Sequence, residues 1–274
     1  MNPGALDPAR LRARAAILSA LRSWFERHGY LEVHTPALVP SPAMEENLEA
    51  VRVGDLFLRT SPEFAMKRVL AAGLCRIYQI GPCFREEELG VHHSREFTLL
   101  EWYRVGAGAE DLMDETEDLI GCAAEAVGRP RPRFRRVRAS ALLEDRGDPE
   151  AWFRAWVERV EPTLRQPTIV TEYPAWQAAL ARVRGEVAER FEVYLSGLEL
   201  ANAFDEETDA DALRARWAAS DAARRRAGRA PHPTDEALLA AVARMPRCAG
   251  IALGVDRLVM ALTEAVDIRQ VQVG

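Results

Sequence analysis

The chain has 274 residues, of which 48% are hydrophobic and 28% charged, a composition typical of a globular protein with a substantial core. No apolar stretch reaches the roughly 20 residues that a membrane span requires, and residues 1–10 lack a basic segment followed by an apolar one, so we expect a soluble cytoplasmic protein with no membrane contact. The net charge of -6 argues against stable nucleic-acid binding through a broad basic surface.

Cysteine and lysine usage narrows the chemistry further. The four cysteines, at positions 75, 83, 122 and 248, have neither metal-ligand spacing nor the density of a disulfide scaffold, so we expect reduced core thiols. Lys67 is the single lysine among the 36 cationic residues. Such a bias is typical of genome base composition, so an arginine is informative here only within a motif.

Helix caps and apolar alternation mark the elements of the first half. A first helix should begin after Asp7 and stop at Gly29, with an apolar face made by Leu11, Ala15, Leu18 and Phe25. The sequence next predicts a strand at 30–33, a helix at 61–73, strands at 76–80 and 97–105, an acidic amphipathic helix at 109–127 and a surface connection at 129–138.

The second half contains a hairpin signal. Ser196-Gly197 separates two strand-like runs, 190–195 and 198–204, whereas 139–166 carries no clear pattern. Helices follow at 210–227 and 235–245, and then a strand that runs into a helix over 251–262. Hairpin-paired strands with helices grouped between them favour an α+β fold, an antiparallel sheet flanked by helices, in one domain that covers 1–274.

The densest group of chemically active residues lies between Arg85 and Tyr103. A charge run alone is typical of an exposed, salt-bridged hairpin. On the second strand of this pair, however, Phe97, Leu99, Glu101 and Tyr103 share one face. A carboxylate on an apolar face requires a cationic partner, and a bound ammonium group would supply one.

Two later segments have features of a nucleotide site. Glu192 and Glu199 fall on opposite arms of the predicted hairpin, where their carboxylates can converge on Mg²⁺, although solvated surface glutamates are an equally good interpretation. Residues 250–257 (GIALGVDR) place small residues in a strand and Arg257 in the first turn of the following helix, so that backbone can approach a ligand closely.

Together these segments resemble the signature motifs of the class II aminoacyl-tRNA synthetases, specifically the lysyl branch. Residues 84–87 (FREE) are similar to the second motif, 252–257 (ALGVDR) to the third, and 29–36 to the first, which in that class lies at a dimer interface. Residues 60–63 (TSPE) and 199–206 (ELANAFDE) resemble lysine-pocket segments. The resemblance implies the class II catalytic fold and a homodimer.

The resemblance also implies a role for each matching residue. Arg85 would bind the α-phosphate and Arg257 the γ-phosphate of ATP, as the catalytic cations, while Phe97 would stack on adenine. The other implied ATP contacts are Glu86, Glu87, His93, Ser94, Glu199, Leu200 and Gly254, with Glu192 and Glu199 holding Mg²⁺. The implied amino-acid contacts are Ser61, Pro62, Glu63, Glu101, Tyr103, Asn202, Glu206 and Ala252.

The chain reaches its first motif after only about 28 residues, with no counterpart of the anticodon-binding domain of lysyl-tRNA synthetases. This truncation resembles the elongation factor P lysine ligase family, which activates (R)-β-lysine with ATP and transfers it to a lysine of elongation factor P. Gln177 and Ala252 match that family better than the synthetases, whereas Ser94 and Ala203 depart from it. We therefore expect ligation of (R)-β-lysine to elongation factor P.

Two other functions stay open at this point. The chain could be a truncated lysyl-tRNA synthetase paralogue that activates α-lysine for tRNA or a small molecule. It could also be a non-catalytic regulatory paralogue that binds lysine. The intact set Arg85, Glu87, Glu199 and Arg257 argues against the regulatory function, because a pure sensor does not need phosphate-binding residues.

Overall fold

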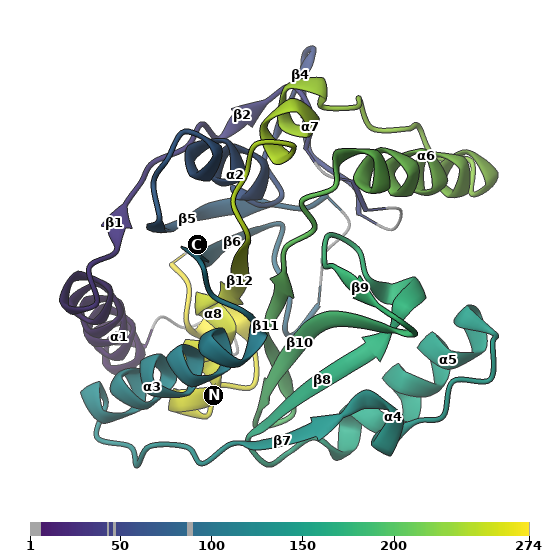
Figure 1. Cartoon of the computed structure of the whole chain (residues 1–274). Helices are drawn as coiled ribbons and strands as arrows, with labels where there is room; N and C mark the ends of the chain where they lie inside the picture. Colours follow the sequence, from purple (N-terminus) through teal and green to yellow (C-terminus); the bar gives the residue numbers. More distant parts are fainter. Residues whose placement is uncertain (1–6, 43, 46–47, 87–89, 274) are drawn as a thin grey trace.

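The computed structural model describes residues 7–42, 44–45, 48–86 and 90–273, and their strands form one large mixed sheet and one small sheet (Figure 1). Over these residues the large sheet has nine strands in the order β1-β5-β6-β12-β11-β10-β8-β7, with β9 paired to β10. Its strands are β1 (Leu31–Glu32), β5 (Arg76–Phe84), β6 (Glu96–Val105), β7 (Arg135–Arg138), β8 (Thr168–Pro174), β9 (Val183–Arg184), β10 (Val187–Leu195), β11 (Leu198–Asp205) and β12 (Cys248–Gly254).

Most neighbouring strands run antiparallel, which confirms the predicted α+β class. Within the described part of the chain, only the outer pairs β1/β5 and β7/β8 are parallel. The small sheet, built from β2 (Leu38–Val39), β3 (Arg52–Val53) and β4 (Leu56–Leu58), lies next to the start of the second helix.

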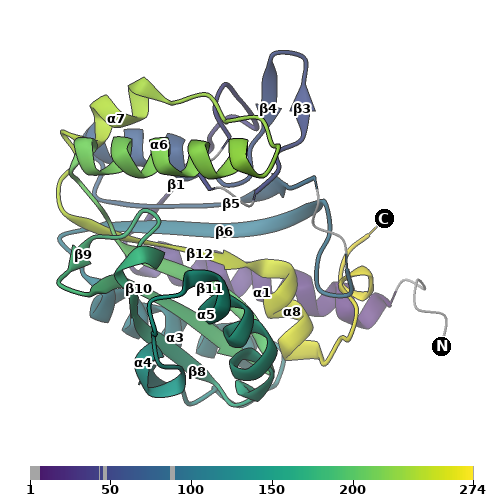
Figure 2. The same cartoon turned by 90° about the vertical axis from the view of Figure 1, so that its right-hand side faces the viewer.

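Helices cover the two faces of the large sheet. Figure 2 shows α6 and α7 on one side of the central strands and α1, α3 and α8 on the other. The helices are α1 (Pro8–Arg27), α2 (Glu63–Ala71), α3 (Ala109–Ala126), α4 (Ala139–Leu142), α5 (Pro149–Ala155), α6 (Ala210–Arg226), α7 (Glu236–Val242) and α8 (Val255–Thr263). Short helical turns lie at Trp156–Val160, Glu161–Thr163, Ala175–Gln177 and Ile268–Gln270. None of the helices in the described ranges is long and apolar enough to cross a membrane.

Successive side chains of β6 alternate between the two faces of the large sheet. Leu100 and Trp102 are fully buried in the main core, which α1, α3 and α8 share. Tyr103 instead packs against Met66 and Leu70 of α2 on the opposite face. The predicted common face of Phe97, Leu99, Glu101 and Tyr103 is therefore confirmed, and it is turned away from the main core.

Helix α1 begins as its cap predicts, because the Asp7 carboxylate accepts a hydrogen bond from the Ala9 amide at 2.9 Å. Its predicted apolar face was only partly right. The buried residues are Ile17, Leu21, Trp24 and Phe25, whereas Ala15 is exposed. The larger side chains determine which face of the helix packs on the core, and a methyl group adds little apolar area.

The hairpin between β10 and β11 turns at Ser196 and Gly197, both with positive φ (57° and 81°), as the sequence predicted. The surface connection predicted at 129–138 was wrong at its end, because Arg135–Arg138 forms β7 and pairs with β8. All four cysteines are free; two are buried as expected, but Cys75 is exposed.

Gly250 in β12 has no room for a side chain. A Cβ atom there would lie 2.2 Å from Cε1 and 2.4 Å from Cδ1 of Tyr103, and 2.7 Å from Oε1 of Glu206. The Tyr103 ring is 2% exposed, so it has no open space into which to move.

We expect Gly250→Ala to lower the free energy of unfolding by about 1–3 kcal/mol through overpacking. Urea unfolding of the variant checks this value. Gly108→Ala is the control, because the nearest atom to its added Cβ lies at an ordinary 3.5 Å and the loss of a glycine N-cap costs no more than about 1 kcal/mol. Equal losses in both variants would contradict the clash.

Candidate active site

A cavity of about 260 Å³ lies over the common face of β6, beside β11, β12 and the first turn of α8. Eight of the residues expected to contact ATP line it: Arg85, His93, Ser94, Phe97, Glu199, Leu200, Gly254 and Arg257. Four of the residues expected to contact the amino acid line it as well: Ser61, Glu63, Asn202 and Ala252. The structure thus brings eight of the ten predicted ATP contacts and four of the eight predicted amino-acid contacts together in one cavity.

The remaining predicted residues do not line this cavity. Pro62 is buried at the start of α2, and the backbone N–H of Glu86 donates to the Glu49 carbonyl at 2.9 Å. Three residues of the amino-acid set, Glu101, Tyr103 and Glu206, are buried beneath the cavity floor. Glu192 of β10 does not line the cavity either, but it pairs with Asn202 of β11, which does. Glu87 lies outside the described residues.

Two guanidinium groups mark one end of the cavity. Arg85 follows β5, and its Cζ lies 5.1 Å from the centre of the Phe97 ring. Arg257 stands in the first turn of α8, where it donates to the Glu199 carbonyl at 2.9 Å and contacts Nε2 of His93 at 2.5 Å. These two cations and an aromatic ring suit a ligand with an anionic chain and a flat base.

Asp256 fixes the position of that helix, a role that sequence reasoning missed. Its Oδ1 accepts from Nη1 of Arg14 in α1 at 2.6 Å, and its Oδ2 accepts from the backbone N–H of Thr98 in β6 at 2.6 Å. Because Asp256 is 2% exposed and charge-paired, it holds α8 against the sheet and so orients the adjacent Arg257. The only feature of the sequence that pointed to Asp256 was its place in the first turn of a predicted helix, which does not indicate a partner.

Glu199 and Glu192 differ in their surroundings. Partial burial and the neighbouring Glu192 carboxylate raise the pKa of Glu199, with Arg257 opposing, although its side chain is 38% exposed to the cavity. Glu192 is bound by the hydroxyls of Tyr173 and Tyr194 and by Arg190. Burial and Glu192 also raise the pKa of Glu161, a further carboxyl group that sequence reasoning missed because 139–166 carries no pattern.

The residues at this end are compatible with a magnesium nucleotide. Among the described residues, no group of three or more His, Cys, Asp or Glu side chains forms a site that could hold a metal by itself. Mg²⁺ usually binds one or two carboxylates together with phosphate oxygens, and Glu199, with Glu192 close behind it, supplies that number.

The floor at the other end is rich in buried carboxyl groups. Glu101 accepts hydrogen bonds from the Ser61 and Tyr103 hydroxyls, both at 2.6 Å. Burial and the neighbouring Glu63 raise the pKa of Glu101 to about 7. Two hydroxyls thus donate to Glu101, Lys67 lowers its pKa from nearby, and the bound ammonium group expected for this carboxylate stays a prediction.

Lys67 occupies the centre of this floor. Its Nζ lies 2.6 Å from Oε1 of Glu63 and 2.7 Å from Oε2 of Glu206, and its side chain is 1% exposed. Burial raises the pKa of Glu206 to about 8, against the opposing effect of Lys67. Burial disfavours the Lys67 ammonium, but Glu206 and Glu63 outweigh burial and raise the pKa of Lys67. Sequence reasoning missed this residue, although Glu63 and Lys67 have the i,i+4 spacing of a helical ion pair.

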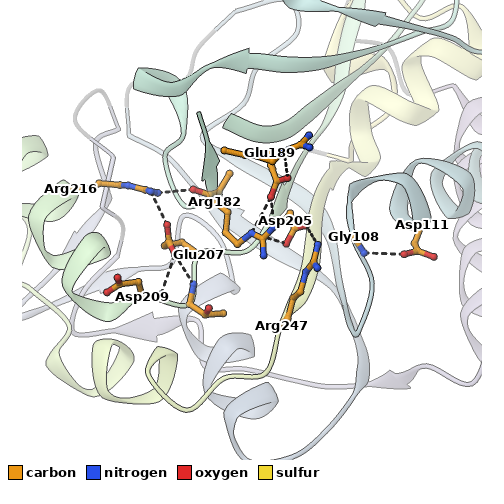
Figure 3. A network of polar contacts seen from close by, with 12 residues as sticks. Gly108, Asp111, Arg182, Glu189, Asp205, Glu207, Asp209, Arg216 and Arg247 are labelled. Carbon is orange, nitrogen blue, oxygen red and sulfur yellow. Dashed lines mark hydrogen bonds and ion pairs between the residues drawn. The ribbon is translucent and has the colours of Figure 1, made fainter. Parts of the chain in front are cut away.

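Ion pairs on both sides fix the backbone at Glu206. Asp205 binds Arg247 at 2.9 Å, and Glu207 binds Arg216 at 2.9 Å (Figure 3). The Glu206 N–H also donates to the Cys248 carbonyl at 3.0 Å. The buried carboxylate is therefore held from a rigid point at the end of β11.

Comparisons with known proteins identify the family of the chain. Residues 8–273 match the family model described as tRNA synthetases class II (D, K and N). Proteins named elongation factor P–(R)-β-lysine ligase from Vibrio campbellii and Proteus mirabilis are 38% and 39% identical, over 92% of this chain and 90% of theirs. A protein of the same name from Erwinia tasmaniensis is 39% identical over 96% of this chain and 94% of its own. The predicted class II synthetase fold is confirmed.

Phe97→Ala should weaken ATP binding by at least about fivefold, because stacking of a base on an aromatic ring contributes about 1–3 kcal/mol. Equilibrium titration with a non-hydrolysable ATP analogue measures the change. Phe153→Ala is the matched control, since Phe153 lies on α5, is 59% exposed and does not line the cavity. Unchanged affinity in Phe97→Ala would place the base elsewhere.

Proposed function

Because the chain belongs to the class II tRNA synthetase (D, K and N) family, we propose that it activates the carboxylate of (R)-β-lysine with ATP and transfers the acyl group to a lysine of elongation factor P. One observation carries the proposal. A single cavity joins the two guanidinium groups of Arg85 and Arg257 to a floor of carboxyl groups. The first end suits phosphates, and the second suits a substrate with two amino groups. The names of the relatives support the acceptor.

In the first half-reaction, an oxygen of the substrate carboxylate attacks the α-phosphorus of ATP, and pyrophosphate leaves. Arg85 stabilises the charge that builds on the α-phosphate, and Arg257 binds the γ-phosphate. Phe97 stacks on adenine, and Glu86, Glu87, His93, Ser94, Leu200 and Gly254 complete the nucleotide site. Mg²⁺, held by Glu199 and Glu192, would neutralise phosphate charge.

In the second half-reaction, the ε-amine of the acceptor lysine attacks the activated carbonyl, an amide bond forms and AMP leaves. The enzyme supplies no covalent nucleophile, so its contribution is positioning and charge stabilisation. The amino-acid end holds the substrate through Ser61, Glu63, Glu101, Tyr103, Asn202 and Glu206, with Pro62 setting the start of α2.

The proposal includes a homodimer and a cytoplasmic location. Leu31 and Leu38, in and after the segment similar to the first class II motif, are 53% and 46% exposed, which suits a surface that a second subunit covers. A single catalytic domain over residues 1–274 is part of the same proposal.

The decisive experiment is ATP–pyrophosphate exchange with (R)-β-lysine and with α-lysine, followed by transfer to elongation factor P and to tRNA. We expect faster exchange with (R)-β-lysine, transfer to elongation factor P and no charging of tRNA. Exchange with α-lysine and charging of tRNA would instead favour a synthetase paralogue. No exchange with either isomer would favour a lysine-binding regulator.

Arg257→Ala should lower the exchange rate by at least about 10²–10³-fold, the loss typical of one group that stabilises transition-state charge. Arg214→Ala is the control, because Arg214 pairs with Glu236 on the surface and does not line the cavity. Near-normal exchange in Arg257→Ala would reject its assignment to the γ-phosphate.

Ala252→Gly should move the preference towards α-lysine. Ala252 faces the cavity between Glu101 of β6 and Asn202 of β11, so its methyl group limits the space for the substrate backbone. One methyl group in a tight pocket is worth about 1–3 kcal/mol of discrimination. The ratio of kcat/KM for the two isomers measures the shift, and an unchanged ratio would show that Ala252 does not select between them.

A further inference from the structure

The floor of the cavity contains more carboxyl groups than cations. Glu63, Glu101 and Glu206 surround Lys67, the single lysine of the chain. Three carboxylates and one ammonium leave two negative charges when all four groups are ionised. A diamino acid such as β-lysine contains two ammonium groups, so its binding would neutralise the cluster.

Lys67 forms an ion pair with only one oxygen of each of its two carboxylate partners. It binds Oε1 of Glu63 and Oε2 of Glu206, one oxygen of each carboxylate. Within the described part of the chain neither oxygen of Glu206 has a hydrogen-bond partner; Oε2 has the ion pair with Lys67, whereas the buried Oε1 has no ion pair either. A buried carboxylate oxygen without a donor is unfavourable, so the negative charge of Glu206 is left for Lys67 and for a cation above the floor to balance.

We infer that Lys67 is a positioning residue for the diamino acid: its ammonium orients Glu63 and Glu206 and fixes the charge of the pocket to match two substrate amino groups. This inference rests on the proposed function, because it takes the carboxyl-rich floor as the diamine end of the cavity. Lys67 acts through its two partners and need not touch the reacting atoms.

Two other titratable side chains beside the cluster stay neutral near pH 7. Tyr103 and Cys248 are buried, and burial and the neighbouring carboxylates raise the pKa of each, so both stay neutral. Asp205, next to Glu206, is paired with Arg247. The groups that titrate between about pH 7 and 8 are therefore the carboxyls of Glu101 and Glu206.

Loss of Lys67 has a predictable sign. Lys67 lowers the pKa of Glu206, so its removal raises that pKa further. A substrate ammonium binds the ionised carboxylate, and the ionised form then requires a higher pH. The acidic limb of the pH profile of kcat/KM reports the pKa values of groups in the free enzyme, so it must move to higher pH.

In the exchange assay, we expect Lys67→Met to raise KM for (R)-β-lysine at least about tenfold and to move the acidic limb up by about one pH unit. KM for ATP should stay within about twofold, since the arginine end is intact. Lys67→Arg, which keeps the charge, should restore the position of the limb. Arg68→Met is the matched control, because Arg68 lies on the same helix but pairs with Asp235 outside the cavity.

An independent measurement uses the wild-type chain and so does not depend on the folding of a variant. Protein labelled with [¹³Cε]lysine gives one lysine signal, because Lys67 is the only lysine. With a non-hydrolysable ATP analogue present, (R)-β-lysine should shift this signal. The analogue (R)-3-aminohexanoic acid, which lacks the terminal amino group, should shift it less.

The outcomes separate this inference from the proposed function. Exchange in the wild type with an unmoved pH limb in Lys67→Met would overturn the role of Lys67 alone. A labelled signal that ignores saturating (R)-β-lysine would do the same, including when Lys67→Met fails to fold. A wild type without exchange for either lysine isomer would overturn both the proposed function and this inference.

Discussion

Burial of carboxyl groups beneath a ligand cavity is the constraint on which the rest of this structure depends. A buried carboxylate is unfavourable unless it is hydrogen-bonded or charge-paired, so each one dictates its surroundings. Lys67 must stand over the end of β11, which requires α2 to pack on that face of the sheet. Gly250 must lack a side chain, because Tyr103 and Glu206 fill the space beside it. The ion pairs that flank Glu206 then keep its backbone in place.

The cavity is consequently polarised along its length. Its arginine end is built from the residue after β5 and the first turn of α8, whereas its carboxyl end is built from α2, β6 and the end of β11. A substrate with a carboxylate at one end and an amino group at the other is favoured in one orientation in such a cavity. The field places the reacting carboxylate next to the phosphates before any chemical step begins.

Local signals made much of this architecture predictable. Asp7 caps α1, the Ser196-Gly197 turn forms its hairpin, and strict alternation placed Glu101 on the cavity face of β6. Features that depend on distant contacts were not predictable. Arg135–Arg138 becomes a strand only because β8 lies beside it. Lys67 acquires a role only when α2 meets the end of β11, a contact between residues 139 positions apart in the chain, which no helical pattern encodes.

Burial of Lys67 has a practical consequence for chemistry at amines. The described surface displays no exposed ε-amino group, since the single lysine is 1% accessible and doubly paired. Active esters, isothiocyanates and any mixed anhydride that leaves the cavity before its acceptor arrives find little on this protein to acylate. In a reaction mixture, an acyl group found on a lysine side chain is therefore expected on the acceptor protein, because the enzyme itself presents almost no lysine that could be labelled.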